Sequence, residues 1–199
     1  MKIIVTGALG HIGSKLIRDL PNFIKDLDIA MIDNFTTQRY SSLFNLTSSA
    51  NYKFYEKDIM QDNLDVIFKN ADVAIHLAAL TEASASLEKP DEYERVNYQG
   101  TKNILDLCQR HSVKMIHFSS TSIYGTKKSI VDEDCEKEDI NPQSPYAETK
   151  LKEEKLVQKY FDENFVKTKT LRLGSICGTS PGMRFHAAIS KFCFQASLG

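Results

Sequence analysis

Short β-forming runs alternate with longer amphipathic segments along most of this chain. Runs of about five residues rich in β-branched and aromatic side chains predict strands; they cover residues 2–6, 28–32, 52–56, 72–76, 114–118 and 168–172. Segments with apolar residues three and four positions apart predict helices; they cover residues 12–20, 64–69, 91–110 and 145–161. Such alternation predicts a parallel sheet with helices on both faces, a doubly wound α/β fold.

The length limits the number of domains. A chain of 199 residues that is 42% hydrophobic can form one full core but is short for two ordinary domains. We therefore expect one globular domain over residues 1–179, followed by residues 180–199 as an incomplete part of a second one. The turn signal Ser180-Pro181-Gly182 precedes a helix that we expect over residues 183–196.

The charged residues nearly balance, with 25 Lys and Arg against 26 Asp and Glu. This balance gives no attraction to nucleic acid or to an anionic membrane, so we expect neither partner. No apolar stretch approaches the ~20 residues of a membrane span, and Met1 leads directly into the first strand, so we expect a cytoplasmic location. The cysteines are Cys108, Cys135, Cys177 and Cys193. Because they form no CxxC pair, we expect reduced thiols without a metal site.

Three glycines, Gly7, Gly10 and Gly13, lie between the first expected strand and the first expected helix. A turn of this kind allows a pyrophosphate to approach bare backbone at a helix N-terminus, although it can also simply connect strand to helix. Asp33 follows the second expected strand, 33 − 13 = 20 residues after Gly13. A carboxylate there accepts hydrogen bonds from the adenosine ribose and repels a 2′-phosphate, so NAD is favoured. Arg39 keeps NADP as an alternative.

Tyr146 and Lys150 are four residues apart, so on a helix they share one face and can reach the same ligand. Ser144 and Pro145 are typical of an N-cap and a first helical turn, which predicts that the helix starts there. A Tyr-x-x-x-Lys pattern alone is common on surface helices. Together with the glycine turn upstream, it indicates a catalytic pair.

Seven motifs occur in a fixed order along the chain. They are Gly7-x-x-Gly10-x-x-Gly13, Asp33, Asp58-Ile59, His76-Leu77-Ala78-Ala79, Asn97-x-x-Gly100-Thr101, Ser119-Ser120 with Tyr124-Gly125, and Tyr146-x-x-x-Lys150. In these motifs the chain resembles the extended short-chain dehydrogenases/reductases, specifically the NAD-dependent nucleotide-sugar epimerase/dehydratase family. The resemblance implies a Rossmann fold, NAD as cofactor, a nucleotide-diphosphate sugar as substrate, and a homodimer formed through the two long helices. It also implies that residues 180–199 begin a smaller substrate domain.

The resemblance assigns roles to individual residues. The implied cofactor-binding residues are Gly7, Gly10, His11, Ile12, Gly13, Asp33, Asn34, Asp58, Ile59, Leu77, Ala78, Ala79, Asn97, Tyr146 and Lys150. The implied catalytic residues are Ser120, Tyr146 and Lys150, and the implied substrate contacts are Ser120, Tyr146, Ser175 and Arg184. Ser175 departs from the asparagine that the family often has at this place. His186 is expected either as a late active-site group or as a structural histidine.

Two residues bear on the reaction type. Thr121 and Ser122 stand where dehydratases of this family carry an Asp-Glu pair, so dehydration is disfavoured. We favour an epimerase that oxidises the sugar at C4 and returns the hydride. A net dehydrogenase or reductase and a non-catalytic NAD-binding module remain as alternatives. The acidic segment 126–143 is expected as a solvated loop, with a substrate gate as the alternative.

Overall fold

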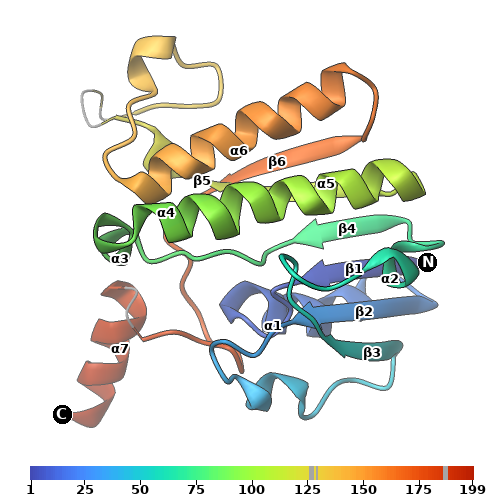
Figure 1. Ribbon diagram of the computed structural model, residues 1–199. Coiled ribbons are helices and arrows are strands. Elements are labelled where there is room, and N and C mark those ends of the chain that lie inside the picture. Colours follow the sequence, from blue (N-terminus) through green and yellow to red (C-terminus); the bar gives the residue numbers. More distant parts are fainter. Residues whose placement is uncertain (126–127, 129, 186–187) are drawn as a thin grey trace. The chain divides into compact units, whose positions relative to one another are not determined.

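The computed structural model describes residues 1–125, 128, 130–185 and 188–199. These residues form two compact units (Figure 1). The first unit comprises residues 1–78 and 175–199, and the second unit comprises residues 79–174. Within the described residues, no helix has both the length and the apolar character needed to cross a membrane.

The first unit contains four parallel strands. They are β1 (Lys2–Thr6), β2 (Leu27–Asp33), β3 (Ala50–Glu56) and β4 (Val73–His76), in the order β3-β2-β1-β4. The chain runs outward from β1 to β3 and then returns to place β4 on the other side of β1. In a doubly wound sheet, ligands bind beyond the carboxyl ends of the strands at such a reversal of strand order. The glycine turn follows β1 at this point.

Three helices belong to the first unit: α1 (His11–Asp19), α2 (Asp65–Phe68) and α7 (Ala188–Leu198). Short 3-10 helices cover Leu20–Asn22 and Tyr40–Leu43. The prediction of a helix over residues 183–196 was wrong at its start, because residues 183–185 are not helical; α7 covers Ala188–Leu198. Hydrogen bonds hold the preceding turn in a non-helical conformation: Gly182 N donates to Ser14 Oγ over 2.9 Å, and Ser41 Oγ donates to the carbonyl of Pro181 over 3.0 Å.

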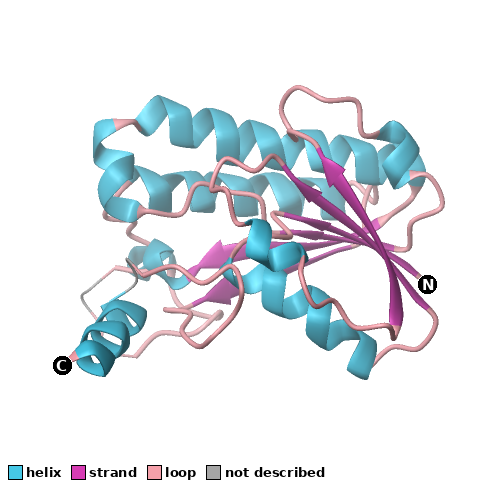
Figure 2. Cartoon of the chain, turned by 90° about the horizontal axis from the view of Figure 1, so that it is seen from below, coloured by secondary structure: helices cyan, strands magenta, loops and turns pink. Residues whose placement is uncertain are grey.

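The second unit contains the parallel strands β5 (Lys114–Ser120) and β6 (Thr168–Leu173). Its helices are α3 (Ala83–Glu88), α4 (Pro90–Tyr93), α5 (Gly100–His111) and α6 (Pro145–Asp162), with a π-helical turn at Glu94–Gln99 and 3-10 helices at Thr121–Ile123 and Lys137–Asp139. The long helices α5 and α6 lie side by side and both pack on β5. In each unit the strands form a layer with helices against it (Figure 2).

The predicted fold class is confirmed: this is a doubly wound α/β fold of the Rossmann type. All six strands lie within two residues of their predicted bounds. The helix expected over residues 91–110 is a helical run from Pro90 to His111, with the π-helical turn inside it. The sequence did not predict α3, because its six residues include two serines and form no apolar stripe.

The acidic segment 126–143 is held at its two ends. Tyr124 and Ile140 form an isolated antiparallel bridge, and Gly125 N donates to the carbonyl of Asp139 over 2.7 Å. Lys128 Nζ also lies 2.7 Å from the carboxylate of Asp139. Residues 126, 127 and 129 of this segment lie outside the described residues.

Candidate active site

The glycine turn of the first unit leaves no room for side chains. Gly7 has a positive φ of 64°, and a Cβ on it would lie 2.7 Å from Ala78 N. A Cβ on Gly13 would lie 2.4 Å from the carbonyl oxygen of Gly7. Real Cβ atoms do not approach backbone this closely, so only glycine fits these two positions. The glycine pattern thus encodes the shape of the turn.

The turn delivers the N-terminus of α1. Among the described residues, no side chain caps this helix, whose N-cap is Gly10. The side chain of His11 points elsewhere, since its Nε2 lies 2.9 Å from the carbonyl of Gly178. The first N–H groups of a helix have no partner inside the helix and carry its positive dipole end. The backbone at His11, Ile12 and Gly13 can therefore hold a phosphate group.

Asp33 ends β2 beside the glycine turn. Its Oδ2 accepts a hydrogen bond from Leu9 N and its Oδ1 accepts one from Phe35 N, both at 3.1 Å. A carboxylate can accept about four hydrogen bonds, so acceptor capacity remains for ribose hydroxyls. Burial raises the pKa of Asp33, while the two backbone N–H groups and then Arg39 oppose this shift.

The neighbouring predicted residues form a small hydrogen-bonded group. Asn34 Nδ2 donates to Asp58 Oδ2 over 3.3 Å, and Met60 N donates to Asp58 Oδ1 over 2.8 Å. Ile59 is buried. Asn34 and Asp58, predicted separately for ribose and adenine, therefore lie together.

Arg39 and Arg184 lie close enough in the first unit to affect each other. Burial lowers the pKa of the Arg39 guanidinium, and the positive charge of Arg184 lowers it further, while Asp33 opposes both. Arg184 thus lies near Arg39, on which Asp33 also acts. Ser175, the other residue predicted only for substrate, is exposed. His186 lies outside the described residues.

In the second unit, α6 starts where its sequence predicts. Ser144 Oγ accepts a hydrogen bond from Ala147 N over 3.2 Å, and Pro145 occupies the first turn. Tyr146 N donates to Ser86 Oγ of α3 over 3.1 Å. The ring of Tyr146 packs edge-on against Tyr93, with 6.4 Å between ring centroids. Two neighbouring segments therefore fix the position of this tyrosine.

Ser120 ends β5. Its Oγ accepts a hydrogen bond from Ser122 N over 3.2 Å and lies 2.9 Å from Ser122 Oγ. Ser119 has the opposite orientation on the strand and is buried, whereas Ser120 is half-buried. Of the two serines, Ser120 is the one a ligand can reach.

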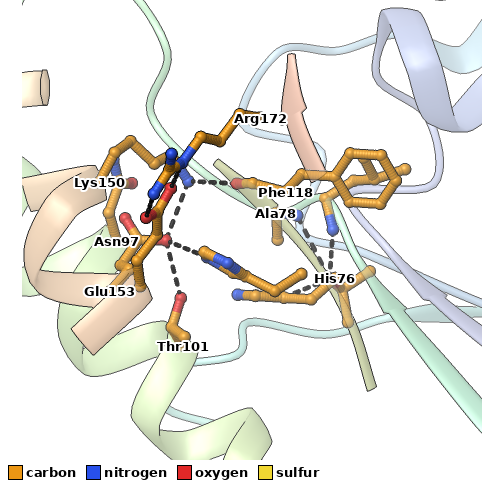
Figure 3. A network of polar contacts seen from close by, with 12 residues as sticks. His76, Ala78, Asn97, Thr101, Phe118, Lys150, Glu153 and Arg172 are labelled. Atoms are coloured by element: carbon orange, nitrogen blue, oxygen red, sulfur yellow. Dashed lines mark hydrogen bonds and ion pairs between the residues drawn. The ribbon is translucent and has the colours of Figure 1, made fainter. Parts of the chain in front are cut away.

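Lys150 is buried one turn after Tyr146, and its surroundings were not predicted. Its Nζ donates to the carbonyl of Phe118 over 3.1 Å, which brings the lysine to the end of β5 near Ser120. The same Nζ donates to Glu153 Oε2 over 2.9 Å (Figure 3). His117 and Thr101 contact that same carboxylate oxygen. One signal was present in the sequence: Glu153 falls on the face of α6 that Ala147 and Lys150 define.

Asn97 lies on the π-helical turn and is buried. Its Oδ1 accepts a hydrogen bond from Leu80 N over 2.8 Å, and its Nδ2 donates to the carbonyl of Leu80 over 2.9 Å. Both ends of its amide therefore hold the segment that begins with Ala79. Leu77 and Ala78 follow β4, where Ala78 N donates to Thr6 Oγ1 over 3.2 Å.

Tyr124 has a structural contact in the second unit. Arg172 makes a two-pronged ion pair with Glu154, at 2.9 and 2.8 Å, and its Nη1 donates to Tyr124 Oη over 2.7 Å. The hydrogen bonds that Arg172 donates to Glu154 raise the pKa of the guanidinium. A groove of about 590 Å³ between α6 and β6 includes Arg172 and Glu154 in its lining but none of the three predicted catalytic residues.

Several known proteins are similar to this chain in sequence. An uncharacterized UDP-glucose epimerase of Bacillus subtilis is 32% identical to this chain. The alignment is 209 residues long and covers 100% of this chain and 64% of the relative. A dTDP-D-glucose 4,6-dehydratase of Dictyostelium discoideum is 31% identical over 174 residues, which cover 80% of this chain and 40% of the relative. The chain thus spans less than two thirds of the length of these relatives.

A solved structure shows the same likeness in three dimensions. The UDP-glucuronic acid 4-epimerase of Bacillus cereus, in complex with UDP-glucuronic acid and NAD, superimposes with a TM-score of 0.83 at 32% identity. The match covers 98% of this chain and 63% of that one. The profile of the NAD dependent epimerase/dehydratase family matches residues 3–196. The expected family and its cofactor, NAD, are thereby confirmed, and the chain belongs to the NAD-dependent epimerase/dehydratase family.

Proposed function

We propose that this chain is the cofactor-binding and catalytic part of a nucleotide-sugar epimerase that inverts C4 through a keto-sugar. The observation that carries the proposal is the placement of Tyr146 and Lys150 on the capped start of α6, with Lys150 bonded to the strand that ends at Ser120. A relative named as a UDP-glucose epimerase and a solved structure of a UDP-glucuronic acid 4-epimerase support it.

The residues of the first unit fit NAD. The glycine turn is a cradle that a Cβ at Gly7 or Gly13 would fill, and Asp33 keeps acceptor capacity for ribose hydroxyls. In the proposal, Gly7, Gly10 and Gly13 hold the pyrophosphate, and Asn34, Asp58 and Ile59 adjoin the adenosine. Leu77, Ala78, Ala79 and Asn97 complete the cofactor site. When bound at these residues, NAD would supply the hydride acceptor for oxidation of the sugar carbon and the hydride donor for its reduction.

Tyr146 supplies the proton transfer. A phenol with its ordinary pKa of about 10 is almost fully protonated at neutral pH, and nearby positive charge favours the phenolate that takes a proton from a sugar hydroxyl. Lys150, one turn along the same helix face, supplies that charge. Ser120 donates a hydrogen bond to the reacting oxygen and orients it. The same phenol returns the proton when the ketone is reduced.

Epimerisation agrees better with these side chains than dehydration. Thr121 and Ser122, which follow Ser120, have no carboxyl group for removing water across a carbon–carbon bond. We also propose that the cofactor-binding domain ends near residue 180. Ser175, before this boundary, and Arg184, after it, contact the substrate diphosphate in this proposal. Pairing of two copies through α5 and α6 belongs to the same proposal.

Replacement of Tyr146 with phenylalanine tests the proposal. Tyr146→Phe is expected to lower turnover of UDP-sugars by at least about a hundredfold while NAD binding is retained, because only the proton-transfer group is lost. A panel of UDP-glucose and UDP-glucuronic acid, with NAD present, provides the assay. Retention of NAD through purification separates an epimerase from a dehydrogenase that exchanges its cofactor.

Tyr160→Phe is the matched control. It removes a hydroxyl from the other end of the same helix, α6, where Tyr160 Oη donates a hydrogen bond to Asp106 of α5. This variant should keep wild-type turnover. Equal turnover in Tyr146→Phe and the wild type would exclude Tyr146 as the base and favour a binding module.

A further inference from the structure

Glu153 is a buried carboxylate that the proposed reaction does not use. Its side chain is 1% exposed. Its Oε2 accepts hydrogen bonds from Lys150 Nζ at 2.9 Å, from His117 Nε2 at 2.9 Å and from Thr101 Oγ1 at 3.1 Å (Figure 3). These donors come from α6, β5 and α5. An unpaired buried carboxylate is costly, so this convergence indicates a built site.

The charges of this cluster follow from its geometry. A carboxylate only accepts, so the proton between His117 and Glu153 is assigned to His117 Nε2. Burial lowers the pKa of His117, an effect that the Glu153 hydrogen bond opposes and Lys150 reinforces. His117 is therefore neutral. Burial raises the pKa of Glu153, but the attraction of Lys150 and the His117 hydrogen bond outweigh it and lower the pKa overall.

One further charged group acts on His117, and it is paired with another residue. Glu154, whose charge also acts on His117, makes its ion pair with Arg172. Lys150 and Glu153 thus form a buried pair of opposite charges, with a neutral imidazole and a hydroxyl as further donors. Besides its contact with the lysine, the carboxylate of Glu153 is hydrogen-bonded from β5, by His117, and from α5, by Thr101.

Lys150 is held in turn at two points. An ammonium group has three N–H donors, and here one goes to Glu153 and one to the carbonyl of Phe118 at 3.1 Å. Two fixed acceptors on different elements determine where the nitrogen lies and where its third N–H points. A flexible four-carbon side chain is thereby reduced to a small range of positions.

We propose that Glu153 is a positioning residue for Lys150, whose ammonium it holds in place for the cofactor, and that His117 and Thr101 fix its carboxylate. The inference rests on the proposed function, together with the cofactor-binding role that the family resemblance implies for Lys150. The competing reading is that Glu153 only stabilises the fold of the second unit. A positioning residue changes NAD affinity through Lys150, whereas a purely structural one changes only the stability of the fold.

A double-mutant cycle separates the two readings. Its variants are Lys150→Met, Glu153→Gln and the double variant, each measured for NAD affinity by calorimetry and for midpoint of thermal unfolding without cofactor. Lys150→Met and Glu153→Gln are each expected to weaken NAD binding by about tenfold, within the usual range of close pairs. In the Lys150→Met background, Glu153→Gln should change NAD affinity by less than about twofold.

The unfolding midpoints give an independent readout. Glu153→Gln leaves a buried ammonium without its counter-charge, so its midpoint should fall, and adding Lys150→Met should raise it again. If Glu153→Gln fails to fold alone, recovery of folding in the double variant supports the coupling, and continued failure overturns the proposal. Glu94→Gln is the matched control, because it removes the exposed partner of Lys152 on the same helix and should change neither readout.

The outcomes distinguish the two proposals. Unchanged NAD affinity in Lys150→Met contradicts the proposed role of Lys150, and the inference falls with it. Weak binding in Lys150→Met but wild-type binding in Glu153→Gln overturns only the positioning role. An equal effect of Glu153→Gln with and without Lys150 overturns it as well, since Glu153 would then act on the fold alone.

Discussion

The glycine turn of the first unit and the Lys150 cluster of the second unit are built from different materials. The turn is made of backbone and has no room for side chains at two positions, since a Cβ at Gly7 or Gly13 would come within 2.7 Å of other backbone atoms. The cluster is made of side chains from three elements, and in it the negative charge of Glu153 balances the positive charge of Lys150. The turn should therefore be sensitive to added volume, and the cluster to charge and pH.

The largest expected effect comes from adding one methyl group to the turn. Gly13→Ala should lower the free energy of unfolding by about 2–3 kcal/mol, because its Cβ would lie 2.4 Å from Gly7 O and the backbone must shift. The gain of ~1 kcal/mol that alanine normally brings inside a helix is too small to compensate. Urea unfolding measures the change, and NAD binding should be lost with it.

Gly174→Ala is the control in the second unit. A Cβ there meets its nearest heavy atom, Thr121 Oγ1, only at 3.9 Å, which is ordinary contact. Its free energy of unfolding should stay within about 0.5 kcal/mol of the wild type. Equal stabilities of the two alanine variants would show that the turn can relax, and the comparison would fail.

A smaller effect is expected where a charge belongs to the backbone-built site. Asp33→Asn should weaken NAD binding by about 1.5 to 2 kcal/mol, in the lower part of the range of about 1.5–3 kcal/mol for a hydrogen bond to a charged group. It should also lower the preference for NAD over NADP, because the repulsion of a 2′-phosphate is lost and Arg39 and Arg184 remain. Calorimetry with both cofactors measures the ratio.

Two opposing effects on stability are expected for this variant at neutral pH. An asparagine side chain has a single acceptor oxygen, so one of the backbone N–H groups of Leu9 and Phe35 loses its partner, at a cost of about 1 kcal/mol. The folded-state pKa of Asp33 is raised by burial, so its ionisation costs stability as the pH rises through that pKa, and removing the charge removes this cost. A loss of stability as large as that of Gly13→Ala would mean that Asp33 serves the fold rather than the ligand.

The sequence predicted the turn far better than the cluster, for a physical reason. Backbone geometry leaves a local signature: Gly7, Gly10 and Gly13 follow a strand, and Asp33 ends the next one. The helix start at Ser144 is equally local. The roles of these residues in binding and catalysis belong to the proposed function.

The cluster joins positions 36 and 52 residues apart, from His117 and Thr101 to Glu153. Each of these residues reads as an ordinary surface group when taken alone. Their burial depends on how α5, α6 and β5 pack, which no local pattern determines. Only the apolar neighbours of Glu153 on the buried face of α6, such as Ala147 and Val157, mark its position in the sequence.

The smallest expected effect appears in the pH dependence of the cluster. Burial holds the folded-state pKa of His117 below its ordinary value of about 6.5, so below that pH the unfolded chain binds a proton that the folded chain does not. Stability should therefore fall as the pH is lowered, by up to about 1 kcal/mol between pH 6.5 and 5.5 for this one group.

His117→Gln should remove that contribution, because glutamine does not titrate yet its amide can still donate to Glu153. Urea unfolding at pH 6.5 and 5.5 measures the difference in slope, and Gly174→Ala should keep the wild-type slope. If His117→Gln also keeps it, the folded protein takes up the proton on His117. The contact with Glu153 would then be an ion pair, and Lys150 would share its counter-charge with a second cation, which weakens the case that Glu153 serves Lys150 alone.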